Sequence, residues 1–271
     1  MQLQDLPADS FFDAPLEDRD YARRRAWIAS LAEAHVPGAS APRVPYTDTE
    51  ERTWRAVWRA LLPALRERAC AEVLAPLEAW APWERGIPQL ADLDSQGGPL
   101  EGTGFRFEPV PGLVPARRFL EALGAGTFLS TQFLRHPSRP LYTPEPDLVH
   151  ELVGHAASFA VPEIATLSRA LGRAARGASP ERMEQLERLY WFTLEFGLVE
   201  SPAGPRALGA GLLSSAGELR AFEDAELRPF DPAEVAAQPF RTDDMQPLYF
   251  VARSLGALAE WTLAFLGPSA T

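Results

Sequence analysis

The sequence predicts a mainly α-helical fold with a small β component. Apolar side chains recur at helical spacing in most segments, whereas only residues 104–133 show the alternation and β-prone composition of strands. The 26 prolines divide the chain into short segments, and we find no internal repeat or low-complexity tract. A length of 271 residues, 46% hydrophobic and 23% charged, is enough for one large domain with a substantial core.

The N-terminal part is predicted to be helical after an irregular start. Residues 1–16 have no regular pattern and are expected to lie on the surface, and residues 17–34 gather their apolar side chains on one helical face. A capping-box sequence predicts that the next helix begins at residue 47 and runs to about residue 71. Pro63 predicts a kink or a break in it. A shorter helix is expected near residues 72–80.

The middle of the chain contains the β component, and helix is expected to dominate after it. Residues 104–111 and 127–133 predict two short strands, with a helix around residues 116–123 between them. Residues 206–216 are apolar and glycine-rich, and no state is assigned to them. The remaining predicted helices span residues 147–157, 162–175, 179–199 and 246–265.

Composition excludes several classes of function. A formal net charge of -11 disfavours nucleic-acid binding, which needs a concentrated basic face. No apolar run approaches the roughly 18 residues of a membrane span, and the N-terminus lacks the pattern of a signal peptide. Cys70 is the only cysteine, so no internal disulfide can form. We therefore expect a soluble, cytoplasmic protein that binds neither nucleic acid nor membrane.

Two histidines form a candidate metal site within one hexapeptide, His150-Glu-Leu-Val-Gly-His155. The spacing differs from the HExxH motif of zinc proteases, in which the histidines are four residues apart on one helical face. Five residues separate these two side chains by roughly 140° around a straight α-helix. Both can face one metal only if the helix ends or distorts between them, and Gly154 permits such a distortion.

A third candidate ligand is Glu195, which lies in the apolar run Leu189-Tyr-Trp-Phe-Thr-Leu-Glu-Phe-Gly-Leu198. A buried, unpaired carboxylate costs several kcal/mol or more, so this side chain must be neutral, paired with an arginine, or bound to a cation. Two imidazoles and one carboxylate make up the facial triad of non-haem Fe(II) oxygenases. Zinc accepts the same ligands, so the donor set alone does not decide the metal.

Three segments of the chain resemble signatures of the pterin-dependent aromatic amino acid hydroxylases. They are residues 143–155, 189–197 and 209–218, with weaker matches at 86–90 and 246–251, and the resemblance covers roughly residues 18–265. It implies a single catalytic domain of this type over residues 17–268. It also implies Fe(II) and tetrahydropterin as cofactors, with O2 as cosubstrate, and hydroxylation of the ring of an aromatic amino acid.

The resemblance also assigns roles to individual residues. It implies that the metal ligands are His150, His155 and Glu195, and that Glu151 and Ser214 assist catalysis, Ser214 by orienting a histidine ligand. The residues that it places around the amino acid substrate are Arg135, Thr143, Trp191, Ser214 and Thr242. The residues that it places around the pterin are Gly112, Leu113, Phe119, Glu151 and Tyr190.

Selectivity is the least defined part of the resemblance. Ala116 replaces a family serine that contacts the pterin. Thr242 occupies a position that is typically Val in phenylalanine enzymes and Asp in tyrosine enzymes, although Asp243 could fill that role instead. The leading hypothesis is conversion of phenylalanine to tyrosine. The rivals are tyrosine 3-hydroxylation, phenylalanine 3-hydroxylation and hydroxylation of a modified phenylalanine in a biosynthetic pathway; a zinc hydrolase is the alternative from a different class.

The resemblance further suggests a monomer or weak dimer. The sequence lacks the N-terminal regulatory domain of the animal enzymes, and it also lacks their long C-terminal assembly helix.

Overall fold

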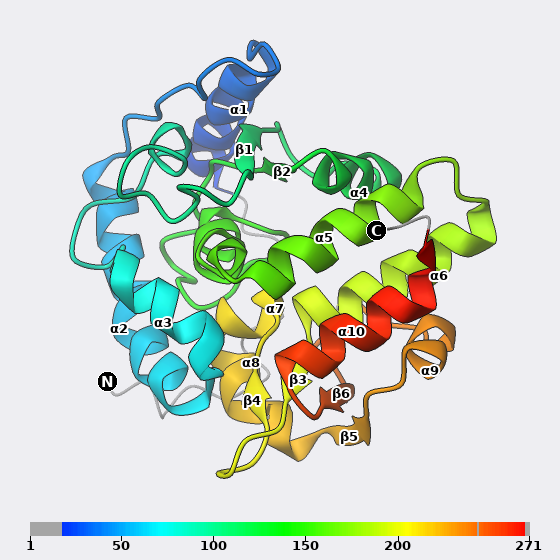
Figure 1. The fold of residues 1–271 in the computed structure, drawn as a ribbon. Helices are drawn as coiled ribbons and strands as arrows, with labels where there is room; N and C mark the ends of the chain where they lie inside the picture. Colours follow the sequence, from blue (N-terminus) through cyan, green and yellow to red (C-terminus); the bar gives the residue numbers. More distant parts are fainter. Residues whose placement is uncertain (1–17, 243, 269–271) are drawn as a thin grey trace.

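The computed structural model describes residues 18–242 and 244–268, so the predicted irregular segment 1–16 and Asp243 lie outside the described residues. Helices predominate within this part of the chain, and the strands are short (Figure 1). The mainly α fold with a small β component is therefore confirmed. None of the helices described is both long enough and apolar enough to cross a bilayer.

Three helices form the N-terminal part, in agreement with the predicted segments: α1 (Arg19–Glu33), α2 (Asp48–Arg68) and α3 (Ala71–Trp80). The predicted capping box begins α2, because the Thr47 hydroxyl accepts from the Glu50 amide while the Glu50 carboxylate accepts from the Thr47 amide. The helix continues through Pro63 without a break. Its apolar face, which includes Trp54 and Leu61, is fully buried.

The predicted strand–helix–strand unit is present as β1 (Arg106–Pro109), α4 (Ala116–Gly124) and β2 (Thr127–Ser130). The two strands are parallel, and α4 is the crossover between them. Helix α4 packs closely on α5 (Pro162–Ala175), where a Cβ added to Gly172 would lie 2.1 Å from the Gly124 nitrogen. Only glycine allows the two backbones to approach this closely.

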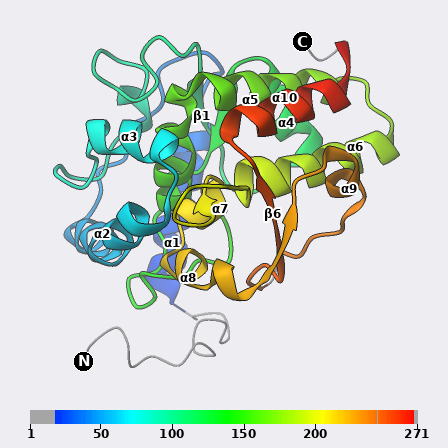
Figure 2. The same ribbon diagram turned by 60° about the horizontal axis from the view of Figure 1, so that its bottom comes forward.

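The C-terminal half combines helices with a mixed sheet. Helix α5 packs against α6 (Pro180–Tyr190) and α10 (Leu255–Leu266), and α6 also contacts α9 (Pro232–Ala237) (Figures 1 and 2). The sheet has the order β4-β3-β6-β5, in which only the β3–β4 pair is antiparallel. Its strands are β3 (Leu198–Val199), β4 (Arg206–Ala207), β5 (Glu226–Pro229) and β6 (Leu248–Ala252).

The single helix predicted over residues 246–265 was wrong in its first part. Residues 248–252 form β6, which pairs with β3 on one side and β5 on the other, and α10 begins only after Ser254 caps it. A short, fully apolar run such as Leu-Tyr-Phe-Val fits a central strand as well as a buried helix, so periodicity could not separate them. The unassigned segment 206–216 contains β4 and the short helix α7 (Ala210–Leu213).

The helix predicted over residues 179–199 was too long and too regular. Helix α6 ends at Tyr190, a π-helical segment η6 (Trp191–Glu195) follows, and β3 occupies residues 198–199. The helix predicted over residues 147–157 is likewise π-helical over the segment η4 (His150–Ala156). Both departures from α-helical geometry fall on the segments that contain the predicted metal ligands.

Candidate metal centre and its cavity

The π-helical form of η4 solves the spacing problem of its two histidines. In a π-helix the hydrogen bonds join residues five apart, so residues at that spacing lie nearly above one another. His150 and His155 therefore share one face, which an α-helix would not allow. Of the two expected possibilities, a helix end or a distortion, the structure shows a distortion, and it extends over the whole of η4.

Gly154 has a different role, which is close packing against α7. A Cβ at this position would lie 2.7 Å from the Ala210 Cβ and 2.8 Å from the Ala210 carbonyl oxygen. Because α7 carries the segment that ends at Ser214, this close approach brings Ser214 to the first histidine. The glycine therefore matters for the site through its missing side chain.

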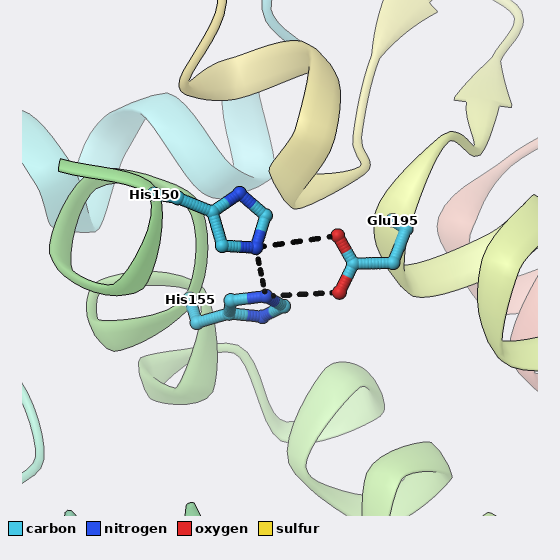
Figure 3. Close-up of side chains that lie close together, drawn as sticks. All are labelled: His150, His155 and Glu195. Atoms are coloured by element: carbon cyan, nitrogen blue, oxygen red, sulfur yellow. Dashed lines mark hydrogen bonds and ion pairs between the residues drawn. The ribbon is translucent and has the colours of Figure 1, made fainter. Parts of the chain in front are cut away.

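The three predicted ligands converge from η4 and η6 (Figure 3). The Nε2 atoms of His150 and His155 are 3.2 Å apart, and they lie 3.5 Å and 3.1 Å from the Glu195 carboxylate oxygens. Donors bound to one metal at about 2.1 Å, with right to tetrahedral angles, are separated by about 3.0–3.4 Å. The donor set therefore fits one first-row metal ion, with all three ligands on one side of it.

The ionisation states of His150 and Glu195 are those that bind a metal. Burial lowers the pKa of His150 to about 4, so its imidazole is neutral near pH 7. Burial also acts to raise the pKa of Glu195, but the histidines and the Tyr190 hydroxyl outweigh it and lower this pKa to about 2. The site offers a neutral imidazole and an ionised carboxylate at neutral pH. No arginine pairs with Glu195 among the ion pairs of the described residues.

Ser214 fixes the tautomer of His150. The serine hydroxyl donates to the Ala210 carbonyl at 2.8 Å, so it accepts at 3.0 Å from the His150 Nδ1–H. With the proton on Nδ1, the Nε2 lone pair faces Glu195 and His155. Asp147 holds the start of the same segment, because its carboxylate accepts from the His150 backbone amide at 3.2 Å.

A cavity of about 190 Å³ opens directly onto the three ligands. Its wall includes four of the five residues predicted to contact the pterin: Gly112, Leu113, Phe119 and Glu151. Ala116 also lines it and presents only a methyl group where the family has a serine hydroxyl. The Phe119 ring meets Phe128 and Tyr190 edge-on, at 5.4 Å and 5.3 Å between ring centres. An aromatic ring, an apolar rim and a buried carboxyl group suit a flat, polar-edged heterocycle.

Glu151 is the buried acid of this cavity. The backbone amide and the hydroxyl of Thr131 donate to its carboxylate at 3.1 Å and 3.2 Å. Burial raises the pKa of Glu151 well above its usual range, against the effect of these hydrogen bonds. Tyr190, the fifth predicted pterin contact, does not line the cavity, and its hydroxyl instead hydrogen-bonds the carboxylate of Glu195.

Arg135 is buried and forms an ion pair with Asp147. Its Nε and Nη2 donate to the two carboxylate oxygens at 2.9 Å and 2.8 Å, and its backbone amide donates at 2.8 Å. Asp147 thus joins the predicted substrate arginine to the first metal ligand. Thr143, predicted near the same end of the substrate, donates to the Glu145 carbonyl at 2.6 Å, and Arg25 pairs with the Glu145 carboxylate at 2.7 Å.

Trp191 begins η6 and is half-buried. Its ring stacks on Phe240 with centres 4.4 Å apart and tilts against Phe196 at 4.7 Å. Thr242 follows Phe240 in the same segment and is exposed, while its alternative Asp243 lies outside the described residues. The structure therefore brings the segment of Thr242 to the predicted substrate wall through the Trp191–Phe240 stack.

Sequence reasoning missed several residues that hold this site: Phe128, Thr131, Asp147 and Gln246. Asp147 had a readable signal, because an acid three residues before a helical histidine is a common cap and a buried arginine needs an acid. Phe128, whose ring centre lies 4.6 Å from that of His155, and Thr131 had none, since only the β1–α4–β2 fold brings them to η4.

The family model described as biopterin-dependent aromatic amino acid hydroxylase matches residues 4–265. The tyrosine 3-monooxygenase of Drosophila melanogaster is 42% identical over 243 residues, which cover 88% of this chain and 42% of that protein. The phenylalanine-4-hydroxylase of Rattus norvegicus is 40% identical over 271 residues, which cover 97% of this chain and 59% of that protein. The chain thus spans about half the length of the curated relatives it matches.

Solved structures give the same result over nearly their full length. The phenylalanine hydroxylase of Chromobacterium violaceum, with bound iron(III) and 7,8-dihydrobiopterin, has a TM-score of 0.80 and 31% sequence identity, covering 94% of this chain and 92% of that chain. The apo enzyme from Colwellia psychrerythraea has a TM-score of 0.77 and 31% identity, covering 87% of this chain and 93% of that chain.

Proposed function

The chain belongs to the biopterin-dependent aromatic amino acid hydroxylase family, and we propose that it is an iron- and tetrahydropterin-dependent monooxygenase that hydroxylates the ring of an aromatic L-amino acid. The observation that carries the proposal is the His150, His155 and Glu195 set facing a cavity that has room beside the ligands. A closed structural zinc site would instead use four protein ligands. The resemblance seen in the sequence is confirmed at the level of the family.

The residues of this chain would bind and orient the reactants. His150, His155 and Glu195 would hold the iron, and Phe119, Gly112 and Leu113 would contact the pterin. When bound, iron and tetrahydropterin supply the oxygen activation and the two electrons that ring hydroxylation requires. The buried Glu151 carboxyl group, which lines the same cavity, would hydrogen-bond the polar edge of a bound pterin.

We infer that Arg135, a buried guanidinium, binds the carboxylate of an amino acid substrate. Asp147 accepts from Nε and Nη2, and among the described residues Nη1 donates only to the Pro140 carbonyl, at 3.5 Å. N–H groups of Nη1 and Nη2 remain for a second carboxylate, with the positive charge already fixed in place. Trp191 would then contact the aromatic ring of the substrate.

For the substrate itself we propose phenylalanine, hydroxylated at the 4-position to give tyrosine. Support comes from the structural similarity, over about nine-tenths of each chain, to bacterial enzymes named phenylalanine hydroxylase. Relatives named tyrosine 3-monooxygenase are equally similar in sequence, so tyrosine and modified phenylalanines remain the alternatives. Residues 17–268 are proposed as the catalytic domain.

The test is a product assay with a panel of substrates. Purified protein, Fe(II), a tetrahydropterin and O2 are incubated with phenylalanine, tyrosine, tryptophan and ring-modified phenylalanines, and products are identified by mass. We expect a mass gain of one oxygen, greatest with phenylalanine, that depends on both iron and pterin. Turnover of tyrosine alone would overturn the choice of substrate. Absence of product from every aromatic amino acid, or hydrolysis without oxygen uptake, would overturn the proposed function.

A further inference from the structure

A buried amide joins two parts of the substrate side of the site. Gln246 lies just before β6 and is 5% exposed. Its Oε1 accepts from the Trp191 indole N–H at 3.0 Å. Its Nε2 donates to the carbonyls of Arg241 and Asp244, at 2.9 Å and 3.3 Å.

The partners of the Gln246 amide determine which end faces Trp191 and which end faces the segment. The indole N–H is a donor only, so it needs the amide oxygen, and the two backbone carbonyls are acceptors only, so they need the amide nitrogen. The pairing therefore fixes the orientation of the side chain. The two carbonyls flank Thr242, which itself is exposed.

The backbone of Gln246 is held by a second set of buried residues. The Gln246 backbone N–H points to the Glu218 carboxylate at 3.4 Å, and the Tyr249 hydroxyl donates to the other oxygen of the same carboxylate. Glu218 lies in α8 (Ala216–Ala221) and Tyr249 in β6, and both are buried. The amide thus projects from the sheet core toward Trp191 and the segment that follows Phe240.

We propose that Gln246 determines substrate selectivity by linking the Trp191 wall of the pocket to the segment 241–244. The proposal rests on the proposed function, since it takes Trp191 as a wall of the substrate pocket. Gln246 is a positioning residue in this scheme, because it acts through Trp191 and through the backbone on either side of Thr242. Selectivity then depends on the position of the segment as well as on the side chain that it carries.

Three substitutions test the two contacts of the Gln246 amide separately: its hydrogen bond with the Trp191 indole (the indole arm) and its hydrogen bonds with the Arg241 and Asp244 carbonyls (the segment arm). Gln246→Glu keeps an acceptor for the indole but turns the other oxygen toward two carbonyls, which breaks the segment arm by repulsion. Trp191→Phe removes the indole donor and also shortens the ring that stacks on Phe240, so its effect is read against the Gln246 variants. Gln246→Met removes both arms at similar side-chain volume. The matched control is Gln238→Glu, because the Gln238 amide donates only to the adjacent Pro239 carbonyl among the described residues.

We expect Gln246→Glu to raise the KM for the aromatic amino acid by about tenfold, the cost of an unsatisfied buried polar contact. The ratio of kcat/KM for phenylalanine over tyrosine should change by about fivefold or more. The KM for the pterin and the bound iron should stay at wild-type levels. Loss of either contact of the Gln246 amide, to Trp191 or to the 241–244 carbonyls, separates the segment from the Trp191 wall. The fold-change in kcat/KM caused by Gln246→Met should therefore be smaller than the product of the fold-changes caused by Gln246→Glu and Trp191→Phe. Gln238→Glu should leave all of these values unchanged.

Hydrogen exchange of the backbone gives a readout that does not require turnover. The amides of Thr242, Asp244 and Met245 should exchange about tenfold faster in Gln246→Glu and Gln246→Met, with no change in Gln238→Glu. A folded Gln246→Glu protein with wild-type selectivity and wild-type exchange in this segment would overturn the inference. A wild-type chain that hydroxylates no aromatic amino acid would overturn the proposed function, and the exchange experiment would still show whether the link exists.

Discussion

The metal centre and the segment 238–246 are built differently. The ligands come from two buried π-helical segments. Ser214 accepts from the His150 imidazole and Asp147 from the His150 backbone amide, while the Tyr190 hydroxyl hydrogen-bonds the Glu195 carboxylate. The segment after Phe240 is irregular and largely exposed, and the Gln246 amide donates to the Arg241 and Asp244 carbonyls within it. The hydroxylation shared by the family needs a metal centre whose ligands are held rigidly in the core. Substrate selectivity can change through the exposed segment 238–246, because a change of its conformation disturbs few packed side chains.

Removal of a metal ligand should have the largest effect, because it breaks the rigid region. Glu195→Gln keeps the shape of the side chain but removes the charge that faces His150 and His155. Loss of an outer partner of a ligand already costs about 10–100-fold, so we expect product formation to fall by more than about a hundredfold. Bound iron should fall in parallel while circular dichroism is unchanged.

The control for this variant is Glu187→Gln, on the same stretch of helix but outside the metal site. It should retain both iron and activity. Wild-type product formation by Glu195→Gln would mean that Glu195 is not a ligand.

A methyl group at Gly154 should have an intermediate effect, because it separates η4 from α7. The added Cβ meets Ala210 backbone and side chain at 2.7–2.8 Å, and these cannot move without shifting Ser214. We expect Gly154→Ala to lower the free energy of unfolding by about 1–3 kcal/mol and to weaken iron binding. Denaturant unfolding and metal titration measure the two effects.

Gly256→Ala is the matched control for this substitution. Gly256 is exposed near the start of α10, and its nearest neighbour would be the Ser254 hydroxyl at 3.9 Å. The free energy of unfolding should rise by up to about 1 kcal/mol, since alanine favours a helix over glycine. Equal destabilisation by the two alanines would refute the close-packing role of Gly154.

Substitution of Thr242 should have the smallest effect on stability and should act only on selectivity. Because the side chain is exposed, Thr242→Val and Thr242→Asp should change the free energy of unfolding by less than about 0.5 kcal/mol. We expect Val to favour phenylalanine and Asp to favour tyrosine in competition assays with both amino acids. Identical product ratios in all three proteins would remove Thr242 from the selectivity of this chain.

Local signals in the sequence predicted much of the fold. The capping box at Thr47, the strand–helix–strand unit of residues 104–133 and helix α5 were all readable, because caps, alternation and helical periodicity are short-range patterns. Strand β6 was not readable, since a central strand is defined by its neighbours β3 and β5. The same limit hid η4 and η6, whose π-helical geometry depends on what packs against them.

The sequence by itself determined which chemical groups are present. Two histidines at a five-residue spacing and one carboxylate in an apolar run pointed to a metal site, because burying such groups without a partner costs too much free energy. Only the tertiary structure decided how they meet. The π-helical turns put both imidazoles on one face. Ser214, from a distant segment, and Asp147, from the adjoining one, hydrogen-bond His150. Gln246 hydrogen-bonds Trp191, which lies 55 residues earlier in the sequence. Those contacts join residues that only the folded chain brings together, so no local pattern records them.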